Sequence, residues 1–180
     1  MLIFQDVFTN DEFMSDIFPF ELAYEDTIMK VKSSYKKPED VGNIDIGCGN
    51  EFGGAEEEPA GPGDSAPVEK VIDVVHNANL QPFQMSKAEF MAYVKAFFAK
   101  VVKHLQDNGK EDRVETFKKG ATAFMKFIAP KFNDIEIYVG ASKTDEDDLA
   151  GSFAISYWED DSAPGPVFYF FKDALKEVKC

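Results

Sequence analysis

The sequence predicts an α+β fold in which a mainly antiparallel β-sheet carries one projecting helical hairpin. Short stretches rich in β-branched and aromatic residues lie before residue 76 and after residue 134. Apolar residues at helical spacing are concentrated between residues 86 and 129. Because strands and helices are segregated along the chain, an antiparallel sheet with separate helices is favoured over an alternating α/β arrangement. We expect one domain covering residues 1–180.

The N-terminal part is expected to contribute strands to the sheet. Residues 2–8 are dominated by apolar side chains and are predicted as the first strand, and residues 9–12 have the composition of a turn. A second strand is predicted over residues 28–32, after the turn-like residues 25–27.

An acidic segment interrupts this pattern. Residues 49–67 read GNEFGGAEEEPAGPGDSAP, which is dense in Gly, Pro and Glu. Such a segment buries too little apolar area to offset the entropy lost on ordering. We therefore expect a flexible acidic loop over about residues 47–67, and a further strand over residues 70–75.

The helical hairpin is the strongest local pattern in the chain. Ser86 followed by Glu89 has the form of a capping box, and Asn108-Gly109 is a helix stop. Asp112 and Glu115 repeat the start pattern, and Pro130 ends the second helix. The two apolar stripes, which place the hairpin at about residues 86–129, are Phe90, Val94, Phe97, Phe98, Val101 and Leu105, then Val114, Phe117, Ala121, Phe124, Met125 and Ile128.

Three more strands are predicted after the hairpin. In residues 135–139 the apolar Ile135, Ile137 and Val139 alternate with Glu136 and Tyr138. Residues 153–158 and 167–171 are aromatic and β-branched, and the polar spacer 159–165 is predicted as the hairpin turn between them.

Composition limits the classes of function. The chain has 180 residues and 18 Phe, enough for a real core, and a net charge of -14 that disfavours nucleic acids and anionic membranes as partners. Only Cys48 and Cys180 are present, so a reducing compartment is expected. Neither a secretory signal nor a membrane span is predicted. We expect mostly monomer, with an intermolecular disulfide through Cys180 under oxidising conditions.

Positive charge is concentrated in the hairpin region. Residues 86–131 contain ten of the 19 Lys and Arg but five of the 33 acidic residues. Lys95, Lys100 and Lys103 fall outside the apolar stripe and are expected to be exposed. They form either an ordinary solvated helix face or a basic surface that binds an acidic partner.

The sequence matches none of the common catalytic patterns. His76 and His104 lack neighbouring metal ligands, and neither a phosphate-binding loop nor a G-x-S-x-G motif is present. We predict a protein without catalytic residues or a required cofactor. The densest acidic cluster, residues 144–148, is either a solvated turn or a weak calcium site, and no metal ligands are assigned.

Several segments in order resemble the translationally controlled tumour protein family over essentially the whole chain. They are residues 2–7 with 11–12 and 15–17, residues 42–45 before the acidic loop, residues 71–75, the capped hairpin, and residues 170–175 with 179–180. Two positions depart from the family pattern. Gly49-Asn50 is followed by Glu51-Phe52 instead of a small residue and Ser, and Gly140 is followed by Ala141 instead of Glu.

The resemblance implies a tent-like β core with a projecting hairpin, similar to a small accessory protein of Rab GTPases. It implies a cytoplasmic, non-enzymatic regulatory protein linked to growth and cell survival. The implied partners are small GTPases such as Rheb, translation elongation factors, tubulin and anti-apoptotic proteins, with weak calcium binding. A calcium-responsive stress protein and a microtubule-binding adaptor that uses Lys95, Lys100 and Lys103 are the alternative functions.

Glu12 matches the acid through which the family contacts a GTPase, and Asp11 lies beside it. An exposed carboxylate at this place is able to pair with a switch-region Lys or Arg, or to compete for the GTPase magnesium. The alternative is that Asp11 and Glu12 only stabilise a turn.

Overall fold

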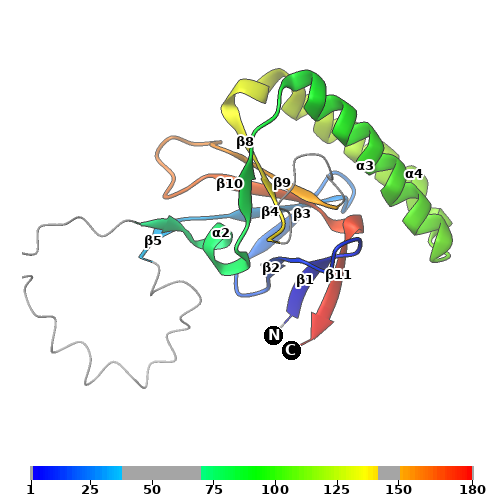
Figure 1. The fold of residues 1–180 in the computed structure, drawn as a ribbon, viewed down its shortest axis with the longest axis horizontal. Coiled ribbons are helices and arrows are strands. Elements are labelled where there is room, and N and C mark those ends of the chain that lie inside the picture. Colours follow the sequence, from blue (N-terminus) through cyan, green and yellow to red (C-terminus); the bar gives the residue numbers. More distant parts are fainter. Residues whose placement is uncertain (1, 38–69, 142–150, 180) are drawn as a thin grey trace, which may run out of the picture.

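The structure is a computed structural model that describes residues 2–37, 70–141 and 151–179 (Figure 1). In this part of the chain, strands form a three-stranded sheet of order β11-β1-β2, a six-stranded sheet of order β3-β4-β10-β9-β8-β7, and the pair β5-β6. All of these pairings are antiparallel, which confirms the predicted fold class. The acidic loop at about 47–67, the acidic cluster at 144–148, and both cysteines lie outside the described residues.

The strands are β1 (Leu2–Asp6), β2 (Glu12–Ser15), β3 (Phe20–Ala23), β4 (Ile28–Lys32), β5 (Tyr35–Lys36), β6 (Val71–Ile72), β7 (Gln81–Phe83), β8 (Ile135–Val139), β9 (Phe153–Tyr157), β10 (Val167–Phe171) and β11 (Leu175–Lys179). The helices are α2 (Asp73–Ala78), α3 (Lys87–Asp107) and α4 (Glu111–Ile128), with the short 3₁₀ segments η3 (Ala129–Asp134) and η4 (Lys172–Ala174).

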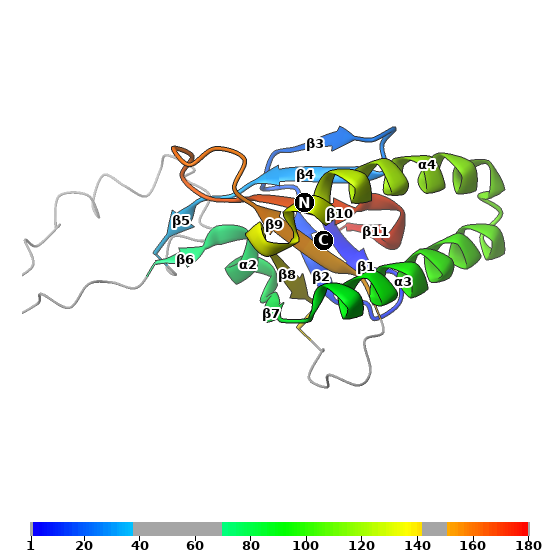
Figure 2. The same ribbon diagram turned by 90° about the horizontal axis from the view of Figure 1, so that it is seen from above.

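The helical hairpin forms as predicted. Ser86 Oγ accepts a hydrogen bond from the Glu89 N–H at 3.2 Å, and the Ser86 N–H donates to Glu89 Oε2 at 3.1 Å, so the capping box is complete. The connection turns at Gly109, whose φ of 71° suits glycine. Figure 2 shows α3 and α4 side by side, with their connected end extending beyond the strands.

The predicted start of the second helix at Asp112 is wrong by two residues. Lys110 is the N-cap, and its side chain makes no capping hydrogen bond. The Lys110 N–H donates to Leu105 O at 2.8 Å, and the Arg113 N–H donates to Lys110 O at 3.0 Å. The first of these bonds closes α3, and the second opens α4 directly after it. Glu111 and Asp112 occupy the first turn of α4, where the helix dipole favours negative charge.

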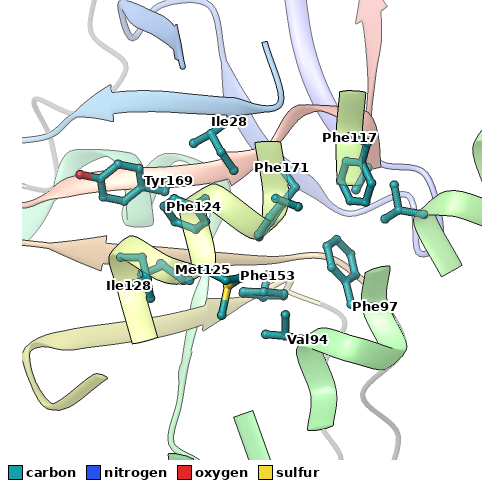
Figure 3. Packing of buried hydrophobic residues seen from close by; sticks show 14 of the residues in the cluster. Ile28, Val94, Phe97, Phe117, Phe124, Met125, Ile128, Phe153, Tyr169 and Phe171 are labelled. Atoms are coloured by element: carbon teal, nitrogen blue, oxygen red, sulfur yellow. The ribbon is translucent and has the colours of Figure 1, made fainter. Parts of the chain in front are cut away.

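Phenylalanine rings fill the space between the hairpin and the six-stranded sheet (Figure 3). The Phe97 ring of α3 lies 5.1 Å from the Phe153 ring and 5.3 Å from the Phe171 ring, both in edge-to-face geometry. All three side chains are at most 2% exposed. Such aromatic pairs add about 0.5–1.5 kcal/mol beyond the effect of burial, so this cluster holds the hairpin on the sheet.

The opposite face of the six-stranded sheet is also buried. Alternate residues of β10 point to the two sides, because Tyr169 and Phe171 belong to the hairpin cluster whereas Phe168 and Phe170 belong to a second cluster. Phe13 of β2 reaches that second cluster and lies 6.4 Å from the Phe170 ring. Burial on both faces explains why β10 is a continuous apolar and aromatic run.

The predicted strand over residues 70–75 is confirmed at Val71–Ile72 and is wrong beyond it, because pairing stops at Ile72 and helix α2 begins at Asp73. The Asp73 carboxylate is 4% exposed, and it accepts hydrogen bonds from the Ser34 N–H at 3.0 Å and from the Val74 N–H at 2.8 Å. This buried acceptor holds the start of the helix against β5 and turns Val74 into the second core cluster.

Other boundaries also differ from the prediction. The first strand ends at Asp6, and Glu12 begins β2 instead of closing a turn. Trp158 lies outside β9, which ends at Tyr157. Strands β2, β3, β5, β7 and β11 were not predicted, because they are short or carry many charged and exposed residues.

The β3–β4 turn fits closely against α4 at Gly120. Tyr24, Glu25 and Asp26 have positive φ angles of 53°, 57° and 63°. A Cβ atom at position 120 would lie 2.7 Å from Thr27 Cβ, so only glycine allows this approach.

We expect Gly120→Ala to lower the free energy of unfolding by about 1–3 kcal/mol through overpacking. The loss occurs even though alanine is the better helix former by about 1 kcal/mol. Urea unfolding followed by circular dichroism measures it. Thr122→Ala, at an exposed position of the same helix, is the control and should not destabilise. A Gly120→Ala protein as stable as its parent would contradict the proposed close packing.

Candidate functional site

The candidate site, called the acidic turn below, comprises residues 7–11, which join β1 to β2 and include Asp11, together with Glu12, the first residue of β2. Glu12 is exposed at the start of β2, whereas the next three residues of that strand are buried. In the sheet register Glu12 pairs with Gln5, and Gln5 pairs with Lys176 of β11. The three residues therefore form a polar row across the three-stranded sheet. The predicted exposure of Glu12 is confirmed, although it lies on a strand.

Asp6 anchors the acidic turn through hydrogen bonds to its buried side chain. Its carboxylate is buried, with 1% of the residue exposed. Oδ1 accepts from the Phe8 N–H at 3.0 Å and from Ser152 Oγ at 3.0 Å. Oδ2 accepts from Thr9 Oγ1 at 2.9 Å and from the Ser152 N–H at 2.8 Å. Four uncharged donors thus satisfy one buried charge, and they join the turn to the start of β9.

The backbone of Asp6 fixes the same turn. Its N–H donates to Asp11 O at 2.8 Å, and its carbonyl accepts from the Asn10 N–H at 2.9 Å. Sequence reasoning missed this role of Asp6. The available signal was a single acidic residue within an apolar stretch, three residues before Thr9-Asn10-Asp11. The partner Ser152 is 146 residues away and gives no local signal.

Asp11 is held beside the end of β8. Its N–H donates to Thr9 Oγ1 at 3.3 Å, and that hydroxyl lies 3.1 Å from Asp11 Oδ2. A Cβ atom at Gly140 would lie 2.8 Å from Asp11 Cβ, so the glycine permits this close approach. Ala141 is exposed next to it. The position where the family pattern has Glu is therefore beside Asp11, and in this chain it adds no carboxylate.

The hairpin supports the acidic turn from α3. The Phe8 ring lies 6.3 Å from the Phe97 ring and 5.9 Å from the His104 ring, both edge-to-face. The Tyr93 hydroxyl donates to the carbonyl of Gly151, next to Ser152. Burial raises the pKa of the Tyr93 phenol above its ordinary value of 10.0, and the negative charge of Asp6 raises it further, so Tyr93 stays a donor.

Strand β11 holds the turn from the other side. Lys176 Nζ donates to Asn10 Oδ1, and Asn10 has a left-handed φ of 65°. The turn is thus fixed by contacts from β11, α3 and the start of β9. The backbone that carries Glu12 therefore loses little conformational entropy when the turn binds a partner.

The basic residues predicted on the hairpin lie elsewhere. Lys95, Lys100 and Lys103 are all exposed on α3, as expected. Phe8 contacts α3 through Phe97, on the buried side of the helix. The hairpin thus contacts the acidic turn through Phe97 and His104, and none of the three lysines makes a ring contact or ion pair with the described residues of that turn.

The described residues contain no group of three or more His, Cys, Asp or Glu side chains arranged to hold a metal ion. In the same part of the chain no helix has the length and apolar character needed to cross a membrane. The proposed calcium cluster at 144–148 and the Cys180 thiol lie outside the described ranges.

Comparison with known proteins gives one consistent result. A family model described as "Translationally controlled tumour protein" matches residues 1–176. A homologue of that protein from Plasmodium chabaudi chabaudi is 35% identical over 184 residues, covering 99% of each chain. One from Mycosarcoma maydis is 36% identical over 179 residues, with the same coverage.

Solved structures agree with the sequence matches. The tumour-associated protein p23fyp from Schizosaccharomyces pombe matches with a TM-score of 0.72 and 26% identity, covering 100% of both chains. The structure of the Caenorhabditis elegans protein matches with a TM-score of 0.64 and 27% identity, covering 100% of this chain and 99% of the other. Both support the arrangement of sheets and hairpin described above.

Proposed function

The chain belongs to the translationally controlled tumour protein family, and from that premise we propose that it is a non-enzymatic, cytoplasmic regulatory protein whose acidic turn binds small GTPases. The observation that carries the proposal is an exposed Glu12 on a turn held by the buried Asp6. Translation elongation factors of the GTPase type are partners of the same class.

The chemistry of the turn supports this choice of partner. A carboxylate forms strong charge-assisted hydrogen bonds with Lys and Arg. GTPase switch regions present such side chains around a bound magnesium ion. Asp11 lies beside Glu12 and adds a second negative charge at the same place. Glu12 pairs with the partner cation, and Asp11 raises the local negative potential that steers the encounter.

We expect Glu12→Gln to weaken binding to a GDP-loaded small GTPase of the Rheb type at least about tenfold, which corresponds to 1.4 kcal/mol. The amide keeps the shape of the side chain but loses its charge. Biolayer interferometry with immobilised GTPase measures the dissociation constant. Glu21→Gln, an equally exposed acid on β3, is the matched control and should bind as the parent does. Unchanged binding by Glu12→Gln, with unchanged circular dichroism, would refute the proposed contact.

A second candidate function uses the positively charged surface of the helical hairpin. Lys95, Lys100 and Lys103 are exposed on a hairpin that extends beyond the strands (Figure 2). This geometry supports an adaptor that binds an acidic surface such as the tubulin tails.

We expect microtubule pelleting that weakens with salt and is lost when Lys95, Lys100 and Lys103 are all replaced by Glu. Screening of exposed charges gives the salt dependence. Co-sedimentation at low and high ionic strength measures it, with Glu12→Gln as a control that should still pellet. Pelleting that persists in the triple variant would exclude these lysines as the contact.

A further inference from the structure

A cavity of about 480 Å³ lies between the connected end of the hairpin and strand β11. Its walls come from the end of α3, the start of α4, η4, and strands β1 and β11. Figure 1 labels α3, α4, β1 and β11. Neither candidate function described above uses it. Its volume is within the range of cavities that hold small ligands, about 300–1,000 Å³.

The cavity is basic in an acidic protein. Lys110, Arg113, Lys172 and Lys176 line it, whereas the whole chain has a net charge of -14. Within the described part of the chain, Lys110 and Lys172 form no ion pair with a carboxylate. A ligand anion would therefore meet cations whose charge is not already neutralised.

The two acidic residues of the wall do not cancel this charge. Arg113 binds Asp173 through both carboxylate oxygens, with Nη2–Oδ2 at 2.8 Å and Nε–Oδ1 at 3.1 Å. That pair joins α4 to η4 and leaves the Asp173 charge balanced by Arg113. Glu177 is exposed on β11, and it balances only one of the remaining lysines.

The floor of the cavity is apolar. Phe4 and Leu105 are 3% and 2% exposed, and Val7 and Leu175 are partly buried beside them. A bare inorganic ion would gain nothing from these side chains. A hydrocarbon chain laid on them would gain about 25 cal/mol for each Å² of apolar surface removed from water.

We propose that this cavity binds an anionic amphiphile, a carboxylate or phosphate group carried on a short hydrocarbon chain. Lys110 and Lys172 contact the charged group, and the hydrocarbon lies against Phe4, Leu105 and Leu175. The proposal does not depend on GTPase binding. Lys176 is shared with the acidic turn, because its Nζ also donates to Asn10, so it is left unchanged in the test.

The test is isothermal titration of the full-length chain with octyl phosphate, octanoate, inorganic phosphate and octanol. We expect saturable one-to-one binding of at least one of the two amphiphiles, at least tenfold tighter than inorganic phosphate or octanol. Tighter binding of octyl phosphate assigns a phosphate ligand, and tighter binding of octanoate assigns a carboxylate ligand. Binding of octanol as tight as that of both amphiphiles, or of inorganic phosphate as tight, would overturn the proposal.

Variants locate the site. Lys110→Glu with Lys172→Glu should weaken amphiphile binding at least tenfold. Lys95→Glu with Lys103→Glu makes the same change of charge on the exposed side of α3 and should weaken it less than twofold. Equal weakening in both pairs would reject the site.

A measurement on the parent protein tests the proposal even if the cavity variant does not fold. The NMR methyl resonances of Leu105 and Leu175 should shift on addition of the bound amphiphile, because both side chains lie on the cavity floor. Absence of these shifts during saturable binding would also overturn the proposal.

Discussion

Replacing Asp6 with alanine is expected to lower the free energy of unfolding by about 3 kcal/mol, because each buried polar group left without a partner costs about 1–3 kcal/mol. The substitution removes the acceptor of the Ser152 N–H and hydroxyl, which are buried, and of the Phe8 N–H and Thr9 hydroxyl. Solvent reaches the donors of the turn after local opening, so the total remains below the sum of four such penalties.

Urea unfolding of the Asp6→Ala protein measures this loss. Asp16→Ala, an exposed acid just after β2, is the matched control and should change stability by less than about 0.5 kcal/mol. Asp6→Ala should also weaken GTPase binding through Glu12, because the turn loses its anchor. A stability within 0.5 kcal/mol of the parent would contradict the role assigned to the buried carboxylate.

The second large effect is expected at the centre of the hairpin cluster. Phe97→Ala should lower the free energy of unfolding by about 3–5 kcal/mol, the usual cost of removing a buried phenylalanine and leaving a cavity. Phe97 is 2% exposed and contacts the rings of Phe8, Phe153 and Phe171. Its loss removes contacts that hold α3 both to the sheet and to the acidic turn.

Thermal and urea unfolding of Phe97→Ala and Phe97→Leu measure this contribution, and the leucine variant should lie between alanine and the parent. Phe20→Ala is the control, because Phe20 is 38% exposed and its truncation leaves no enclosed cavity. If Phe97→Ala were no more costly than Phe20→Ala, the hairpin would be held by contacts other than this aromatic cluster.

The features predicted from sequence are those that depend on near neighbours. The hairpin was predicted because its stripes and its capping box, Ser86 with Glu89, are local patterns. Strand β10 was predicted because burial on both faces gives it an uninterrupted aromatic run. In both cases the residue pattern within one segment, helical periodicity for the hairpin and a short aromatic run for β10, is sufficient to identify the element.

The features that sequence reasoning missed depend on contacts between distant residues. Strand β11 is identified by pairing with the opposite end of the chain, where Leu2 lies opposite Lys179. Helix α2 begins at Asp73 because its carboxylate binds Ser34, 39 residues earlier. Local patterns favoured a strand there, since Val and Ile dominate the segment.

The candidate site shows the same division. Glu12 was singled out through the family resemblance, and its exposure is confirmed. The support beneath it is a buried network of Asp6 and Ser152, which the sequence does not bring together. Gly140 was noticed only for the residue that follows it, and the structure shows that its own lack of a side chain makes room for Asp11.

The most direct test of the central claim, that the acidic turn is the GTPase contact, is NMR mapping on the parent protein. Backbone amide resonances are followed while a GDP-loaded small GTPase is added. We predict the largest shifts or line broadening at residues 10–13 and at Gln5 and Lys176, which lie in the same row of the sheet. Changes confined to the exposed side of α3, around Lys95, Lys100 and Lys103, or no changes at all, would contradict the claim.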